Sequence, residues 1–256
     1  MSDASPSAAA ADGVDSRDFS FAFQPIVDTH ARVVYSHEAL VRGLNNEPAY
    51  QVIKRYSSNQ MAAFDAACRA KAIEVAARIG VSTNLNLNFL PTAAFNEAVG
   101  LNSTIEAADR HAFPLDRIIL EATEGEAIGN HAQFAKVVNE YRRAGMRLAI
   151  DDFGAGYSGL NLLSEFQPDI VKLDMALIRD IDTDRVKRTI VRNTLSMLRD
   201  LGIEPICEGV ETLGEHDVLR DLGVSLMQGY LLARPAVEAL PPISWARSIV
   251  GIARSA

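Results

Sequence analysis

Short runs of apolar and β-branched residues recur along the chain after residue 18, and longer amphipathic stretches separate them. Eight runs predict strands, which cover Phe21–Val27, Val33–Leu40, Thr83–Phe89, Ile118–Ala122, Arg147–Asp151, Ile170–Leu173, Glu204–Cys207 and Ser225–Met227. Because these runs alternate with helical stretches over one uninterrupted length, the pattern favours a parallel α/β fold.

Three of the intervening stretches carry a helical pattern: Met61–Ile79, Asn130–Ala144 and Asp184–Leu201. In the second stretch the apolar residues Phe134, Val137, Val138 and Tyr141 fall at positions i, i+3, i+4 and i+7, and Gly145 follows as a stop. A glycine also follows the other two stretches. The apolar spacing therefore predicts amphipathic helices over Asn130–Ala144 and Asp184–Leu201, and the Ala-rich composition of Met61–Ile79, which ends at Gly80, predicts a third helix.

Two architectures fit this alternation: a closed barrel and an open, doubly wound sheet. No glycine-rich phosphate-binding pattern follows the first predicted strand, which weakens the dinucleotide-binding form of the open sheet. The 256 residues suit a single (β/α)8 barrel, which commonly needs about 250. Met1–Asp18 is rich in Ala, Ser and Asp and is expected to be a flexible tail, so residues 19–256 would form one domain.

Composition narrows the class of protein further. Apolar residues make up 48% of the chain, so a large core is expected, and the net charge of -8 disfavours duplex nucleic acid as a partner. The two cysteines form no CxxC motif, which suggests a reducing, cytoplasmic compartment. No run approaches the ~18 apolar residues of a membrane span.

Polar side chains occur near the carboxyl ends of the predicted strands. The acidic ones are Glu38, Glu121, Asp151, Asp152 and Glu208. In a barrel these strand ends converge on one mouth, which is where barrel enzymes hold their active sites. Five gathered carboxylates would repel one another without a cation, and hard oxygen ligands suit Mg²⁺ or Mn²⁺ better than Zn²⁺.

Structural roles remain open for individual residues in this set. A single acid at a strand end is more often a helix cap or a solvated loop residue than a metal ligand, so the repetition over several strands carries more weight. Asn84, Asn86 and Asn88 share one strand face, and Asn88, nearest the strand end, is the best candidate ligand among them. Lys172 interrupts an apolar run, so it would meet the carboxylates either as a structural ion pair or as a catalytic group.

Taken in order, several short motifs resemble those of the EAL-domain cyclic di-GMP phosphodiesterases. The first is Glu38-Ala39-Leu40 with Arg42 two places on. The others are Phe23–Val27, Glu121–Glu124, Asp151–Ser158, Lys172–Asp174, Glu208–Glu211 and Gln228–Tyr230. The three-residue motif alone is unspecific, whereas the ordered set covers nearly all of the chain after the tail.

The resemblance implies a TIM-like (β/α)8 barrel in which one strand runs antiparallel, and hydrolysis of cyclic di-GMP to linear 5′-pGpG by two-metal activation of water. It implies that one divalent cation, Mg²⁺ or Mn²⁺, is held by Glu38, Asn88, Glu121 and Asp151, and a second by Asp151, Asp152 and Glu208. Lys172 would contact the attacking water and, with Asp152 and Glu208, carry out catalysis. Gln24, Leu40, Arg42 and Gln228 would contact the dinucleotide, and Glu124 would anchor the loop that begins at Asp152. A homodimer is also expected.

Two departures from the family pattern are visible: Leu90 follows Phe89 where a serine is common, and Gly43 follows Arg42 where an aromatic residue is common. Neither removes an implied ligand. Three other functions stay open: a catalytically silent cyclic di-GMP receptor, a protein-interaction adaptor, and an unrelated metal-dependent barrel enzyme of the enolase type. The absence of a GGDEF-type motif argues against cyclic di-GMP synthesis.

Overall fold

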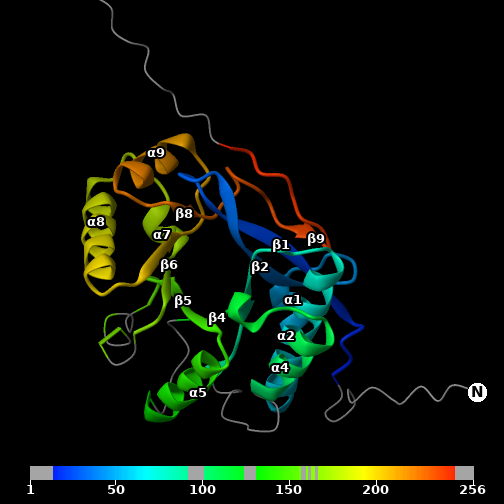
Figure 1. The fold of residues 1–256 in the computed structure, drawn as a ribbon. Coiled ribbons are helices and arrows are strands. Elements are labelled where there is room, and N and C mark those ends of the chain that lie inside the picture. The colour runs from blue at the N-terminus through cyan, green and yellow to red at the C-terminus, as the bar shows by residue number, and fades with distance from the viewer. Residues whose placement is uncertain are drawn as a thin grey trace, which may run out of the picture.

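A computed structural model describes residues 14–91, 101–123, 131–156, 160, 163–164 and 167–245. Within them, eight strands close into a barrel in the order β2-β3-β4-β5-β6-β7-β8-β1, and β1 also pairs with β2 (Figure 1). Strands β2 to β8 pair in parallel, and β1 is antiparallel to both of its barrel neighbours. The predicted TIM-like barrel with one antiparallel strand is confirmed, and the open sheet is wrong.

All eight predicted strands are present, with bounds close to those of the apolar runs. They are β1 (Phe19–Asp28), β2 (Val33–Gly43), β3 (Asn84–Asn88), β4 (Ile118–Thr123), β5 (Arg147–Phe153), β6 (Ile170–Leu173), β7 (Glu204–Cys207) and β8 (Leu226–Met227). A ninth, two-residue strand, β9 (Ala236–Val237), pairs with β1 antiparallel beside the barrel.

Helices surround the barrel (Figure 1). They are α1 (Ala49–Ile53), α2 (Met61–Arg78), α4 (Leu101–Arg110), α5 (His131–Arg143), α7 (Met175–Ile178), α8 (Arg185–Asp200) and α9 (Leu213–Asp221), with the 3₁₀ turns η1 (Ser58–Gln60) and η2 (Leu115–Arg117). The sequence pattern predicted α2, α5 and α8. It missed α1, α4 and α9, which have ten residues or fewer and so show fewer than three turns of periodicity.

The residues at the two ends of α8 explain why the sequence predicts this helix. The Asp184 side chain accepts hydrogen bonds from the main-chain N–H groups of Val186 and Lys187 and so caps the first turn. At the other end Gly202 has φ 71°, the left-handed conformation in which helices commonly stop. Gly145 closes α5 in the same way, with φ 97°.

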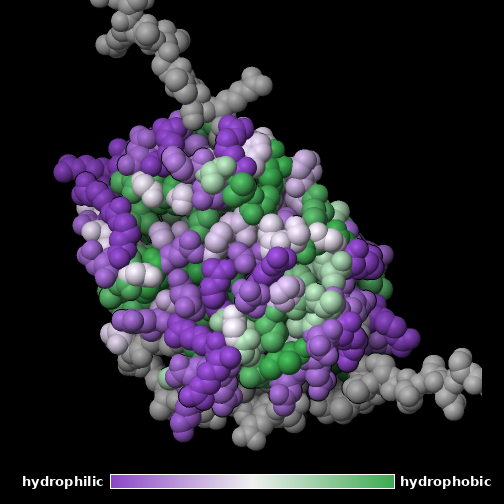
Figure 2. All heavy atoms as spheres, viewed as in Figure 1, coloured by the Kyte–Doolittle hydropathy of each residue, from purple (hydrophilic) through white to green (hydrophobic). Residues whose placement is uncertain are grey.

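The barrel interior is layered along its axis. Its middle is filled by six apolar side chains, those of Ile26, Ile119, Ala149, Ile170, Ile206 and Leu226. A larger core lies between the outer barrel wall and the helices, and it includes Val14, which precedes the expected domain start at Phe19. On the outer surface, hydrophilic residues are interspersed with apolar ones, and apolar residues gather over α1 and α2 (Figure 2). No helix in the described ranges combines the length and the apolar character needed to cross a membrane.

Candidate active site at the barrel mouth

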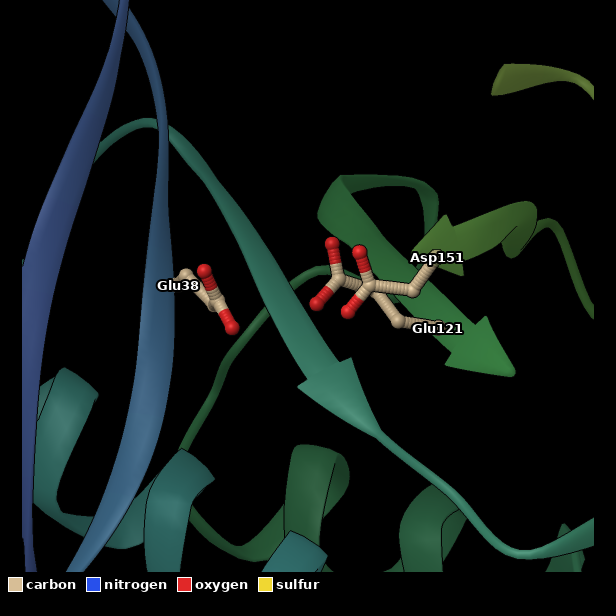
Figure 3. Close-up of side chains that lie close together, drawn as sticks. All are labelled: Glu38, Glu121 and Asp151. Atoms are coloured by element: carbon tan, nitrogen blue, oxygen red, sulfur yellow. The ribbon is translucent and has the colours of Figure 1, made fainter. Parts of the chain in front are cut away.

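Five acidic residues form a carboxylate cluster at the barrel mouth: Glu38 on β2, Glu121 on β4, Asp151 and Asp152 on β5, and Glu208 directly after β7. The carboxylates of Glu38, Glu121 and Asp151 face one another across the barrel (Figure 3). Oxygen atoms of these three lie within 4.8 Å of one another, and so do those of Asp151, Asp152 and Glu208. Asp151 belongs to both groups, so its carboxylate connects them.

A β-bulge brings the consecutive residues Asp151 and Asp152 to the same site. In a regular strand, neighbouring side chains would point to opposite faces. The register of β5 against β6 shifts between Ile150 and Phe153, and Asp152 adopts a left-handed φ of 54°. Aspartate tolerates this conformation better than most residues, and bulges next to active sites commonly redirect a side chain. The bulge therefore turns both carboxylates toward the mouth.

Lys172 on β6 is the positive centre of the carboxylate cluster. Its Nζ lies 2.7 Å from Glu208 Oε1, 2.9 Å from Glu121 Oε1, 3.1 Å from Asp151 Oδ1 and 3.5 Å from Glu38 Oε2. The side chain is fully buried. Burial opposes the ammonium charge, but the surrounding carboxylates, with Asp151 first, raise the pKa of Lys172 well above its usual value.

One ammonium group cannot balance four adjacent carboxylates, and the pKa values of the acids reflect this excess. Burial raises the pKa of Glu121 to about 8, although Lys172 acts in the opposite direction. Burial likewise raises the pKa of Glu208 well above its usual range. For Asp152, burial and then Asp151 and Asp174 raise the pKa to about 6. The cluster therefore favours the uptake of protons or cations.

Asn86 and Asn88 on β3 have different surroundings. Asn86 is fully buried, and its Nδ2 donates to Glu121 Oε1 at 2.7 Å. Asn88 pairs with Glu121 in the strand register and is exposed at the end of β3. Asn88 is thus free to present its amide oxygen at the mouth, whereas Asn86 orients Glu121. The alternation of polar and apolar residues shows that both side chains share one strand face, but it does not reveal that Asn86 contacts Glu121.

The amides of Gln24 and Gln228, expected to contact the dinucleotide, line a cavity of about 290 Å³ at the mouth together with Glu38, Asp151, Asp152 and Glu208. Gln228 Nε2 donates to Glu38 Oε2 at 2.7 Å, and Gln24 Nε2 donates to the Ala233 carbonyl at 3.1 Å. Each amide is therefore anchored on one side. Among the described residues, the buried Gln228 Oε1 has no hydrogen-bond partner.

Leu40 borders a second cavity of about 370 Å³, which is mostly apolar and also reaches Glu38, Asn88 and Glu121. Arg42 is half-buried and donates from Nη1 to the Val41 carbonyl at 2.8 Å. It is not among the described residues that line these two cavities. Glu124, the expected loop anchor, lies outside the described residues, as do Tyr157 and Ser158 of the glycine-containing loop.

Fold and site together define an α/β barrel whose mouth gathers carboxylates from four strands around one lysine. The family model of the EAL domain matches residues 7–235, and the chain belongs to this family. The Glu38-Ala39-Leu40 segment that gives the family its name supplies one acid of the cluster.

Two solved structures closely resemble the chain. A standalone versatile EAL protein from Vibrio cholerae O395, in its c-di-GMP bound form, has a TM-score of 0.85 and 46% identity, and the match covers 89% of this chain and 96% of that one. Klebsiella pneumoniae BlrP1 in a manganese/cy-diGMP complex at pH 9.0 has a TM-score of 0.83 and 36% identity, covering 90% of this chain and 59% of that one.

Two curated relatives point to different functions within the family. The blue light- and temperature-regulated antirepressor BluF of Escherichia coli (strain K12) is 30% identical over 226 residues, which are 88% of this chain and 56% of BluF. The cyclic di-GMP phosphodiesterase RocR of Pseudomonas aeruginosa PAO1 is 33% identical over 162 residues, which are 63% of this chain and 41% of RocR. The chain thus spans about half the length of these relatives.

Proposed function

We propose that this protein hydrolyses cyclic di-GMP to linear 5′-pGpG with two divalent cations, Mg²⁺ or Mn²⁺. The observation that carries the proposal is the carboxylate cluster around Lys172 at the mouth of an EAL-family barrel. The phosphodiesterase named among the relatives and the cyclic di-GMP complexes among the solved structures support the choice of substrate.

The donor set suits hard divalent cations. Every candidate ligand atom is a carboxylate or amide oxygen, the type that Mg²⁺ and Mn²⁺ prefer. Within the described residues, the buried Glu121 Oε2 has no hydrogen-bond partner, so it is available to a ligand. In the proposal Glu38, Asn88, Glu121 and Asp151 hold one cation, and Asp151, Asp152 and Glu208 hold the other. Bound cations would polarise the phosphodiester and acidify water.

The reaction adds one water across one phosphodiester bond. The water oxygen attacks phosphorus, the bond from phosphorus to the 3′ oxygen breaks, and that oxygen leaves with a proton. Lys172 Nζ would orient the water and offset the negative charge that develops on the phosphoryl oxygens. Asp152 and Glu208 would complete the catalytic set, and Gln24, Leu40, Arg42 and Gln228 would hold the dinucleotide. Glu124 is proposed to anchor the loop that begins at Asp152.

A second candidate function is a catalytically silent receptor or adaptor. BluF, which matches most of this chain, is named as an antirepressor. The complete carboxylate cluster of this chain favours hydrolysis, because neither an adaptor nor a receptor requires five acids around a buried lysine. We propose separately that the chain forms a homodimer. Light scattering on the purified protein as it leaves a size-exclusion column tests this by giving its mass.

The deciding experiment incubates the purified chain with cyclic di-GMP and Mg²⁺ or Mn²⁺ and separates the products by chromatography. We expect pGpG from the wild type and a loss of at least about a hundredfold in rate for Glu121→Gln, which removes a ligand charge. The control is Glu204→Gln at the opposite end of the barrel, which should keep its rate. Binding without turnover would select the receptor, and no binding would select the adaptor or an unrelated enzyme.

A further inference from the structure

A buried ion pair on α2 lies outside the carboxylate cluster. Asp65 and Arg69 are one helical turn apart and only 6% and 2% exposed, and Arg69 Nη1 donates to Asp65 Oδ2. Arg69 Nε also donates to Thr104 Oγ1 on α4 at 2.9 Å. Burying two charges costs so much hydration that apolar residues of similar size often give equal or greater stability. A gain in stability is therefore a weak explanation for the presence of this buried ion pair.

The other oxygen of Asp65 contacts the chain just beyond β3. Asp65 Oδ1 accepts a hydrogen bond of 2.9 Å from the main-chain N–H of Leu90, two residues after Asn88. The intervening Phe89 donates its N–H to the Glu121 carbonyl at 2.9 Å. Its ring packs against Phe134 and Tyr141 of α5, at centroid distances of 6.5 and 5.9 Å. The two peptides after Asn88 are thus held by Glu121 on one side and Asp65 on the other.

Asn88 depends on these contacts because the sheet holds it on one side only. The pairing of β3 with β2 ends at Leu87, whereas its pairing with β4 continues to Asn88 opposite Glu121. Asn88 is exposed and lines the 370 Å³ cavity beside Glu38 and Glu121. Asp65 borders the same cavity. The direction of the chain at Leu90 therefore affects where the Asn88 amide lies.

We propose that Asp65 is a positioning residue, which fixes the Leu90 peptide and so keeps the Asn88 amide oxygen beside Glu121 for a divalent cation. Arg69, itself held by Thr104, orients the Asp65 carboxylate. The inference rests on the proposed function only in taking the mouth as a cation site, and it requires no turnover. Groups that orient a metal ligand in this way commonly change metal affinity 10- to 100-fold when removed.

The test compares two double variants that contain no buried charge at this position. Asp65→Leu with Arg69→Met removes the acceptor for Leu90, while Asp65→Asn with Arg69→Met keeps an acceptor oxygen of nearly the same shape. Replacing both charges avoids an unpaired buried ion, so both variants should fold with similar melting temperatures. Mn²⁺ binding to the full chain is measured by calorimetry and by electron paramagnetic resonance, without substrate.

We expect the leucine variant to bind Mn²⁺ about 10- to 100-fold more weakly than wild type, and the asparagine variant to recover most of that loss. Adding Asn88→Ala to the leucine variant should cause little further loss, because both changes act on one ligand. Equal losses in the two double variants, or wild-type affinity in the leucine variant, would overturn the inference. So would a wild type that binds no Mn²⁺. A wild type that binds Mn²⁺ yet forms no pGpG would refute the proposed function and leave this inference standing.

Discussion

Both ends of the barrel interior carry ionisable side chains, but their charges are arranged differently. The amino-terminal ends of the parallel strands form the end of the barrel opposite the mouth, here called the bottom, and it holds a triad of Tyr35, Arg147 and Glu204. Tyr35 Oη donates to Glu204 Oε2 at 2.5 Å, and Arg147 Nη1 donates to Tyr35 Oη at 2.7 Å. Arg147 Nη1 lies 4.0 Å from Glu204 Oε2, and the side chains of both residues are partly exposed. This bottom triad balances one positive charge with one negative charge.

The mouth has no such balance. Lys172 faces four carboxylates within 3.5 Å, and it is completely buried. Six apolar side chains separate this layer from the bottom triad. The comparison teaches that ionisable side chains at the end of a barrel do not by themselves mark a candidate site. A buried surplus of one sign does, because the excess charge attracts a ligand of opposite charge, whereas a balanced pair neutralises itself.

The largest effect on stability should come from removing Lys172. Lys172→Met leaves the carboxylates without their cation, so we expect the free energy of unfolding in metal-free buffer to fall by about 3–5 kcal/mol. Mn²⁺ should restore part of this loss, because it supplies positive charge at the same place. Urea unfolding with and without Mn²⁺ measures both effects.

The control for that experiment is Arg147→Met in the bottom triad. Because Arg147 is partly exposed, its loss should cost about 1 kcal/mol, and Mn²⁺ should not restore it. Equal losses in the two variants, or equal rescue by Mn²⁺, would contradict the contrast between the two ends.

The second prediction concerns pH. The pKa of Asp152 is raised to about 6, so the folded chain binds a proton there that the unfolded chain has already released. Stability of the metal-free protein should therefore fall as the pH rises from about 4 to 6. Over the same range Mn²⁺ affinity should rise, because protons compete for the carboxylate. Glu121, with a pKa raised to about 8, should extend the rise in affinity to higher pH.

Calorimetric titrations at several pH values check this expectation, with Asp152→Asn as the matched variant. The variant should bind more weakly and lose the lower part of the pH dependence. At the bottom of the barrel, burial and then Glu204 raise the pKa of Tyr35 above its usual value, so Tyr35 stays protonated throughout. An unchanged profile in Asp152→Asn would assign the pH dependence to other acids.

Much of this arrangement could be predicted from the sequence, since apolar runs mark strands and their polar ends converge in a barrel. The bulge at Asp151–Asp152 could not, because hydrogen-bond register leaves no trace in the hydrophobic pattern. Asp65 and Arg69 have the spacing of a helical ion pair, but only the tertiary structure shows that Asp65 reaches Leu90. The lysine among carboxylates was expected from its apolar neighbours, whereas Asn86 as the partner of Glu121 was not.

The smallest expected effect on stability is that of removing the Tyr35 hydroxyl from the bottom triad, and this change tests the comparison at the bottom of the barrel instead of at the mouth. Tyr35 stands opposite no residue of β1, because the register shifts there from Ile26↔Ser36 to Val27↔Val34, and its side chain packs on the apolar layer inside the barrel. Tyr35→Phe keeps the ring and removes only the hydroxyl that links Arg147 to Glu204. We expect a loss of about 0.5–1.5 kcal/mol in unfolding free energy, the usual value of a hydrogen bond.

The rate of pGpG formation and the Mn²⁺ affinity of Tyr35→Phe should stay at wild-type values, because the apolar layer separates the triad from the mouth. A change in either would mean that the two ends are coupled through the barrel, and the bottom could then no longer be regarded as purely structural.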